Sequence, residues 1–533
     1  MVVLCYQVGK GELSWSGPDY HTAPEGDPKQ IAARGAGVAN SLNFSANPDL
    51  SMKEYDLIVI GTGSAMNLLD PMIQENPKIR IAVIDKDEPG GICLTRGCIP
   101  SKLLLYPAEI VRTAEKGRDL GVSAEVKVDF PKIMKRMRTL IDADISSIRE
   151  GLSTSPNIDY YHASAEFVAP YTMQIADETI MGKQFFLCTG SRTTIPPIKN
   201  IEKVGYLTSD SVLGLTSLPA TMVIIGGGYI AAEYGHFFSS MGSRVSIIGR
   251  NKQFLPGYEP EVALVARREL ERHMTIATNC EVVEIGEKDG MKVLTARDRE
   301  SGETSEAEAE QVLIAVGREP LNDILHPERA GIKTGAGGWI AVDEHLQTNQ
   351  PNIWALGDAD GRHLFKHVAN YESQVVYYNA VLKKKLKTDY HAVPHAVFTY
   401  PEVAGVGQTE KEAIEERGED DVAIGFYLYE NTAKGEAMDA KEYFVKAVVQ
   451  RSTMKILGAQ IVGPQASVLI QEIVNVMYTP DQSVSVVNRA MHIHPALSEV
   501  VGRAFLSLAA PRDYHHMLGH LGLETGEDYL HHE

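Results

Sequence analysis

Two cysteines lie close together in the stretch GGICLTRGCIPSK, residues 90–102. Cys93 and Cys98 are separated by four residues, in a chain of 533 residues that has only five cysteines. A disulfide can close a gap of this size if the loop curls back on itself. Apolar side chains after Cys98 recur with helical spacing, so we expect Cys98 near a helix N-terminus, where the dipole and unpaired amides stabilise a thiolate.

A zinc site is the main alternative for this cysteine pair. Zinc would need two further soft ligands. The remaining cysteines, Cys5, Cys188 and Cys280, are isolated and have no CxxC motif or neighbouring histidine partner. The sequence therefore favours a redox-active disulfide over half of a metal site, and we predict no bound metal.

A glycine-rich turn precedes the cysteine loop. The run YDLIVIGTGSAM begins at Tyr55 with an apolar strand that leads into Gly61 and Gly63, and a second strand, IAVID, ends in Asp85. This is the order of a mononucleotide-binding βαβ unit, in which a helix N-terminus receives a pyrophosphate and the acid bonds the ribose hydroxyls. Met66 stands where the third glycine of the pattern would be, so we expect looser packing of the helix on the strand.

The same pattern returns at residue 221, in TMVIIGGGYIAAEYG followed by RVSIIGRNK. Gly226, Gly228 and Ala231 form the GxGxxA version of the turn. Because each such unit binds one nucleotide half, two of them in one chain predict two dinucleotide sites.

The end of this second unit bears on the choice between NADH and NADPH. Gly249 takes the place of the acid that would bond a free ribose 2′-hydroxyl, and Arg250 and Lys252 follow it. A 2′-phosphate requires cations and no carboxylate nearby. The sequence therefore favours NADPH and leaves NADH open; the alternative is that both cations are solvated surface charges.

Length and composition limit the classes of function. A chain this long predicts two to four domains, and a formal net charge of −19 argues against nucleic acid or an anionic membrane as partner. No apolar run approaches the roughly 18 residues of a membrane span, and the start lacks a signal peptide. Few cysteines favour a cytoplasmic location. Residues 1–51, rich in Gly, Pro, Ser, Asn and Ala, are expected to be a poorly structured extension.

Taken in order, the motifs resemble those of the class I pyridine nucleotide–disulfide oxidoreductases. GGICLTRGCIPSK is similar to the active-site signature of that family. Four further motifs follow in the family's order: CTGSRTTIPP at 188–197, AVGREPLND at 315–323, WALGD at 354–358 and HIHPALSEVVGRAF at 492–505. The resemblance extends from Met52 to about residue 508.

The resemblance implies an α/β fold with two Rossmann-like dinucleotide-binding domains and a C-terminal α+β dimerisation domain. The motif order divides the chain into an FAD-binding domain in two parts, 52–196 and 319–391, with an NAD(P)-binding domain at 197–318 between them. The dimerisation domain is expected at 392–510. A His-rich tail, 511–533, follows and is expected to be a solvated helix.

The resemblance also assigns the cofactors. FAD would be bound along Gly61, Gly63 and Asp85, with Asp358 at its ribityl chain, and Gly190 and Gly317 are further cofactor-binding residues. Lys102 would lie near the flavin N5, paired with Glu233 from the NADPH domain. That pairing makes electrostatic sense, because a cation beside the isoalloxazine stabilises the reduced flavin.

The family's mechanism implies roles for the remaining residues. Cys98 would be the thiol next to the flavin, and Cys93 the interchange thiol that attacks the substrate disulfide. Thiol–disulfide exchange needs a base that titrates near neutral pH, and His494, oriented by Glu499, is the candidate. In the family this histidine reaches the disulfide of the other subunit, so the resemblance implies a homodimer.

Within the family, GTGSAMNLLD, LFKHVANYES and GAQIVGPQASVLIQ are similar to mycothione reductases, which implies a low-molecular-weight disulfide as substrate. The alternative is a dihydrolipoamide dehydrogenase, which would use NAD and a lipoyl-carrying protein. A non-catalytic nucleotide-binding flavoprotein is a third class. Arg96, between the cysteines, could lower a thiolate pKa or bind a substrate carboxylate; its alternative is to point to solvent.

Overall fold

The computed structural model describes residues 52–523, so the extension expected at 1–51 lies outside the described residues. A five-stranded, a four-stranded and a six-stranded sheet form the framework of the part that begins at Glu54. Within the described range, no helix is long and apolar enough to cross a membrane.

The five-stranded sheet carries the first glycine turn, and all its strands are parallel. Its order is β18-β8-β2-β3-β4. The strands are β2 (Leu57–Ile60), β3 (Ile81–Asp85), β4 (Ile158–His162), β8 (Phe185–Leu187) and β18 (Ile353–Ala355). Residues from both sides of the second nucleotide-binding unit therefore join in one sheet.

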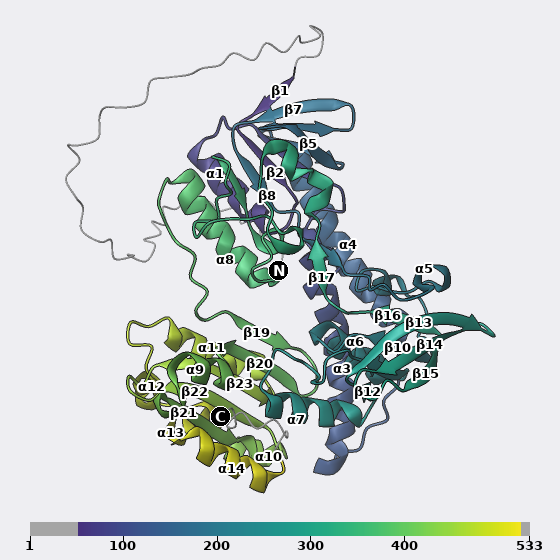
Figure 1. Cartoon of the computed structure of the whole chain (residues 1–533), viewed down its shortest axis with the longest axis vertical. Coiled ribbons are helices and arrows are strands. Elements are labelled where there is room, and N and C mark those ends of the chain that lie inside the picture. The colour runs from purple at the N-terminus through teal and green to yellow at the C-terminus, as the bar shows by residue number, and fades with distance from the viewer. Residues whose placement is uncertain (1–51, 524–533) are drawn as a thin grey trace. The chain divides into compact units, whose positions relative to one another are not determined.

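Both faces of this sheet are covered, which explains why β2 is apolar at every position. Leu57 and Val59 point to the face covered by two helices, which Figure 1 shows on the same side of the sheet. Ile58 points to the other face, where antiparallel strands pack. The covering elements are α1 (Leu69–Glu75), α8 (Lys366–Val376), β5 (Ala165–Ala169), β6 (Thr172–Ile175) and β7 (Glu178–Gly182).

The four-stranded parallel sheet carries the second glycine turn, in the order β12-β11-β10-β16. One face packs on helices and the other on a three-stranded antiparallel sheet, with Ile224 on the first face and Val223 on the second. The elements are β10 (Thr221–Ile225), α6 (Tyr229–Met241), β11 (Arg244–Ile248), α7 (Pro260–Glu271), β12 (Thr275–Ala277), β13 (Cys280–Lys288), β14 (Met291–Asp298), β15 (Thr304–Ala309) and β16 (Gln311–Ile314).

Two long helices run from the cysteine loop to this second sheet, α3 (Cys98–Gly117) and α4 (Phe130–Thr154). In α3, Leu104, Ala108 and Val111 are spaced to form one apolar stripe, and they share a core with α4 and α6. The cysteine loop is thereby held between the two nucleotide-binding units.

The six-stranded sheet is antiparallel and contains the C-terminal segment, in the order β19-β20-β23-β22-β21-β24. Its strands are β19 (Pro394–Val397), β20 (Glu402–Gly407), β21 (Val422–Leu428), β22 (Phe444–Gln450), β23 (Ile456–Gly463) and β24 (Leu508–Ala509). Its helices are α9 (Glu410–Arg417), α10 (Ala433–Ala437), α11 (Ala466–Met477), α12 (Val484–Arg489), α13 (Ser498–Leu506) and α14 (Pro511–Leu521). The predicted fold class, α/β with two Rossmann-like sheets and a C-terminal α+β part, is confirmed.

The expectation of a solvated tail is wrong for residues 511–523. Tyr514 and Leu518 lie on one face of α14 and are buried. The Tyr514 ring packs 5.6 Å from that of Phe426, and its hydroxyl donates to Glu261 at 2.5 Å. This apolar face outweighs the polar histidines around it. Residues 524–533 lie outside the described range.

Beneath α14 lies a buried charge cluster centred on Lys446 of β22. The Lys446 ammonium is 3.2 Å from Glu259, 2.6 Å from Glu261 and 2.7 Å from Glu410. All four side chains are at most 4% exposed. A buried charge is tolerated only when paired and hydrogen-bonded, so this cluster joins α7, α9 and β22 tightly.

Candidate active site

A cavity of about 780 Å³ lies where the first parallel sheet, α3, α6 and α8 meet. This volume is in the range of cofactor pockets. Nine of the residues assigned from the sequence line it: Gly61, Gly63, Asp85, Cys93, Cys98, Lys102, Gly190, Glu233 and Asp358. Eight others do not: Gly226, Gly228, Ala231, Arg250, Lys252, Gly317, His494 and Glu499.

The first glycine turn needs both of its glycines, for different reasons. Gly61 has φ +96°, and a Cβ there would be 2.2 Å from the Cys188 carbonyl oxygen. A Cβ on Gly63 would have no neighbour within 4 Å, so that position leaves the cavity wall open to a ligand. Asp85 accepts hydrogen bonds from the amide and hydroxyl of Thr62, at 2.8 and 2.5 Å. A tight turn, an open wall and an acid at the strand end fit a dinucleotide such as FAD.

The helix after this turn departs from the common pattern. It begins as a 3-10 turn, Ser64–Leu68, and becomes α-helical only at Leu69. Met66, at the third glycine position, is partly buried against the core beside the sheet. Its side chain occupies the space that close helix–strand packing would require.

The cysteine loop forms a short helix, α2 (Gly91–Thr95), that leads directly into α3. Cys98 is the first residue of α3, and both cysteines are free thiols. A hydrogen bond from Cys93 lowers the pKa of Cys98 to about 7; burial opposes this and the Lys102 charge assists it. The same hydrogen bond, together with burial, raises the pKa of Cys93. The pair is therefore poised as a Cys98 thiolate and a Cys93 thiol.

Lys102 and Glu233 form an ion pair across the cavity. The Lys102 ammonium is 2.9 Å from each carboxylate oxygen of Glu233, which lies on α6. It also lies 4.3 Å from the centre of the Phe398 ring, and the Phe398 amide donates to Glu233 at 3.1 Å. The cation thus lies between the Glu233 carboxylate and the Phe398 ring, one turn along α3 from Cys98.

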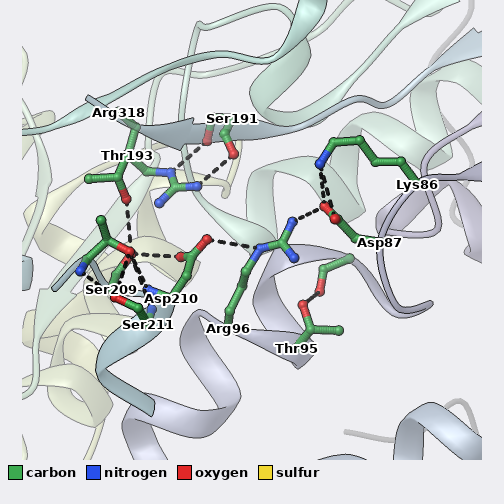
Figure 2. Close-up of polar contacts among 12 residues, drawn as sticks. Lys86, Asp87, Thr95, Arg96, Ser191, Thr193, Ser209, Asp210, Ser211 and Arg318 are labelled. Carbon is green, nitrogen blue, oxygen red and sulfur yellow. Dashed lines mark hydrogen bonds and ion pairs between the residues drawn. The ribbon is translucent and has the colours of Figure 1, made fainter. Parts of the chain in front are cut away.

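Asp358 follows β18 and belongs to a second polar group of the cavity. Burial raises its pKa, and a hydrogen bond from Ser191 opposes that shift. Arg318 in turn donates to the Ser191 hydroxyl at 2.7 Å and to its carbonyl at 2.8 Å (Figure 2). Ser191 and Arg318 lie on two neighbouring antiparallel strands, β9 (Ser191–Thr193) and β17 (Arg318–Pro320). These two strands link the five-stranded sheet to the segment that contains Gly317.

Arg96 neither points to solvent nor offers a free charge to a ligand. Its guanidinium lies between two carboxylates, 2.5 Å from Asp87 and 3.3 Å from Asp210 (Figure 2). Asp87 follows β3, whereas Asp210 lies between the two nucleotide-binding units. The positive charge of Arg96 is therefore already paired within the protein. The structure does not support Arg96 as a ligand for a substrate carboxylate.

The second glycine turn repeats the geometry of the first. Gly226 has φ +135°, and a Cβ there would be 2.1 Å from the Ala315 carbonyl oxygen, whereas one on Gly228 would meet nothing within 4 Å. Ala231 is buried in α6. The open turn at the N-terminus of α6 suits a pyrophosphate. It lies outside the 780 Å³ cavity.

A carboxylate that sequence reasoning missed lies beside Arg250. Glu281 of β13 is 3.7 Å from the Arg250 Nε and 3.3 Å from Arg297. The Arg250 carbonyl accepts from Arg299 at 3.1 Å. Two arginines thus pair with one acid beyond the end of β11, and a third, Arg299, bonds the backbone of Arg250. No local signal reveals this, because Glu281 comes from another strand some thirty residues away.

His494 and Glu499 are bonded to each other but not to the cysteines. The His494 Nδ1 is 3.1 Å from both carboxylate oxygens of Glu499, and the His494 side chain is 71% exposed. The hydrogen bond to His494 lowers the pKa of Glu499. His492 instead bonds Glu472 at 2.7 Å. In a single chain, His494 does not line the cavity.

Lys366, the first residue of α8, is a cavity residue to which the sequence assigned no role. Its ammonium donates to the Ser64 hydroxyl at 2.9 Å. The sequence did contain an indication of a role for this residue. A lysine at a helix N-terminus is disfavoured by the helix dipole, so its presence there calls for another interaction that stabilises it.

Comparisons with known proteins agree with this geometry. Residues 55–393 match the model described as pyridine nucleotide-disulphide oxidoreductase, and residues 393–505 match that family's dimerisation domain, which supports a homodimer. Mycothione reductase of Mycobacterium tuberculosis (strain H37Rv) is 33% identical over 469 residues, covering 86% of this chain and 100% of the relative. Dihydrolipoyl dehydrogenase 3 of Haloarcula marismortui is 32% identical over 464 residues, covering 84% and 95%.

Among solved structures, the Cu(II) complex of the HOCl-induced flavoprotein disulfide reductase RclA from Escherichia coli superposes with a TM-score of 0.76. It is 28% identical and covers 85% of this chain and 99% of its own. Proteins of the matched family use FAD and NAD(P)H. The chain belongs to the pyridine nucleotide-disulphide oxidoreductase family and is a flavoprotein disulfide oxidoreductase.

Proposed function

We propose that this protein uses FAD to reduce a low-molecular-weight disulfide with electrons from NADPH, as a mycothione-reductase-like enzyme. The single observation that supports this most is the Cys93–Cys98 pair, in which one sulfur is poised as a thiolate beside the Lys102 ammonium. When bound, FAD supplies the two-electron relay between a reduced nicotinamide and a disulfide. The domain boundaries and site roles expected from the sequence are part of this proposal.

The chain's own residues account for exchange with the substrate once the pair is in its dithiol state. The Cys93 thiolate attacks one sulfur of the substrate, which forms a mixed disulfide and releases one thiolate. The Cys98 thiolate then attacks Cys93, which restores the internal disulfide and releases the second thiolate. The substrate gains two electrons and the cysteine pair loses two.

His494 of a second copy would handle the protons. It would accept the Cys93 proton before attack and return it to the first leaving thiolate, while the second takes a proton from water. Glu499, bonded to its Nδ1, leaves Nε2 free for this exchange. The exposure of His494 in a single chain supports this arrangement.

The preference for NADPH rests on the end of β11. Gly249 leaves no acid at that strand end, and Arg250 and Lys252 follow it. Arg297 and Arg299 add positive charge close to Arg250. Glu281 is already paired with two of these arginines, so it does not oppose a 2′-phosphate as a free acid would.

The test is a steady-state comparison of purified holoenzyme with a panel of small disulfides, each with NADPH and NADH. We expect a kcat/KM at least about tenfold higher with NADPH, and turnover that Cys93→Ser abolishes. Activity only with dihydrolipoamide and NAD would replace this proposal with the dihydrolipoamide dehydrogenase alternative. Bound FAD without reduction of any disulfide would favour the non-catalytic class.

A further inference from the structure

A second lysine, on a different helix from Lys102, lines the cavity that holds the cysteine pair. Lys366 opens α8 and lines the same cavity as Cys93 and Cys98. Whereas Lys102 approaches Cys98 along α3, Lys366 comes from the segment that follows β18. The cavity therefore brings one cation from each of two unrelated elements toward one pair of sulfurs.

A chain of hydrogen bonds sets the position of the Lys366 ammonium. Lys366 donates to the Ser64 hydroxyl at 2.9 Å, and that hydroxyl donates to Asn370 at 3.0 Å. Asn67 also donates to the same Asn370 oxygen, at 3.2 Å. Because the Ser64 hydroxyl donates its hydrogen bond to Asn370, a lone pair of its oxygen accepts the hydrogen bond from the lysine. The ammonium is thus held in place by neutral groups.

Among the residues that the structure describes, Lys366 has no carboxylate partner. Across residues 52–523, no carboxylate lies within ion-pair distance of its ammonium. It is also half-buried at a helix N-terminus, where the dipole repels a cation. A desolvated and uncompensated charge is costly to maintain, so its position is explained if a negative charge develops nearby during the reaction.

The thiols supply such a charge. Burial lowers the pKa of Lys366, and among the opposing influences that of Cys93 is the largest, ahead of Cys98 and Cys188. The hydrogen bond with Cys98 and burial raise the pKa of Cys93, and the Lys366 charge opposes that rise. Cys188, the other buried thiol, has its pKa raised by burial and by Glu372. Lys102 and Glu233 act instead on Cys98.

We propose that Lys366 is a positioning residue for the interchange thiol: its ammonium stabilises the thiolate of Cys93 when the pair is reduced, as Lys102 stabilises that of Cys98. This inference rests on the proposed function, in which Cys93 attacks the substrate. The division of labour gives each sulfur its own cation, so that the two thiols can ionise in turn.

The test follows the alkylation of each sulfur by mass spectrometry of the peptide that contains it, because the chain has three other cysteines. In the Cys98→Ser background, the pH dependence of iodoacetamide alkylation reports the Cys93 thiolate. In the Cys93→Ser background, the same measurement reports Cys98. We expect Lys366→Met to raise the Cys93 midpoint by about one pH unit, a roughly tenfold slower alkylation at pH 7, and to move the Cys98 midpoint much less. Lys102→Met should do the reverse.

Two further variants are matched controls. Lys366→Arg retains the charge, so the pH midpoint of Cys93 alkylation should stay close to that of the parent. Lys387→Met removes an exposed lysine that pairs with Glu344 outside the cavity, and it should leave both midpoints unchanged. Alkylation does not require the flavin, so a variant that loses FAD is compared with its parent stripped of FAD.

The proposal is overturned if Lys366→Met leaves the Cys93 midpoint in place, or if it moves the Cys98 midpoint by as much. These results are independent of the proposed function, because that proposal fails on a different observation: the unmodified holoenzyme reduces no disulfide with NADPH. A protein with the predicted thiol shifts but no such activity would retain the electrostatic role of Lys366 alone.

Discussion

The ammonium of Lys102 lies 2.9 Å from each carboxylate oxygen of Glu233, which joins the helix that begins at Cys98 to the helix that follows the second glycine turn. Beyond the hydrogen bond from Cys93 and the effect of burial, Lys102 lowers the pKa of Cys98 and Glu233 raises it. Two residues that bond each other therefore act on one sulfur in opposite directions.

Variants of the two partners distinguish the effect of charge on the Cys98 pKa from the effect of a loss of structure. Lys102→Met should raise the pH midpoint of the Cys98 thiolate by about one unit, whereas Glu233→Gln should lower it. The measurement is alkylation against pH in the Cys93→Ser background. Glu319→Gln, which removes an acid paired with Arg192, is the control and should change nothing. A shift in the same direction for both variants would mean that loss of structure, not charge, dominates.

Arg96 should influence the two kinds of substrate equally. Because its guanidinium is already bonded to Asp87 and Asp210, Arg96→Val is expected to change kcat/KM for an anionic and a neutral disulfide by the same factor. The same variant should lower Tm by roughly 2 °C, since it removes the ion pair of Asp210 and leaves Asp87 paired with Lys86 alone. Steady-state kinetics and thermal unfolding check both. A loss confined to the anionic disulfide would restore Arg96 as a substrate ligand.

Mixed dimers test whether His494 serves the other subunit. Cys93→Ser and His494→Ala should each be inactive as pure dimers. After the two are unfolded, mixed in equal amounts and refolded, random pairing should restore about a quarter of the original activity, because half of the dimers contain one complete site. Mixing Cys93→Ser with Cys98→Ser is the control and should restore none. Failure to recover any activity in the first mixture would place the base within the same chain as its cysteines.

The docking of α14 predicts a pH-dependent stability. Burial works against the charged form of His515, but the Glu410 carboxylate at 2.8 Å outweighs it and raises the pKa of His515 above 6.5. The stabilisation is therefore fully present below pH 6.5 and is lost as pH rises through the raised value. We expect Tm to fall between about pH 6 and about pH 8, and His515→Gln to flatten that fall. His516→Gln, on the exposed side of the same helix, should retain it.

The two glycine turns and the start of α3 could be predicted from the sequence because each depends on local residues. Gly61 and Gly226 each have a positive φ, and a backbone carbonyl lies where a side chain would be. In the sequence, an apolar strand comes directly before each of them. Cys98 begins its helix because a glycine precedes it and helical spacing follows. Short-range rules of this kind need no knowledge of distant segments.

Charge partners were beyond the sequence because they come from far along the chain. Arg96 finds Asp87 nine residues away but Asp210 more than a hundred residues on. Glu281, which pairs with Arg250, lies in another sheet, and the acids that pair with Lys446 lie in α7 and α9. Polar histidines concealed the apolar face of α14 for the same reason: only the fold decides which side of a helix is covered.

The burial of Leu523 after α14 has a practical consequence for handling the protein. Removing the helix before this leucine would take Tyr514 and His515 away from Glu261 and Glu410, and would let water reach three acids that share one ammonium. Truncated versions made for crystallisation should therefore keep residue 523, and purification tags at this end should be attached through a spacer beyond it.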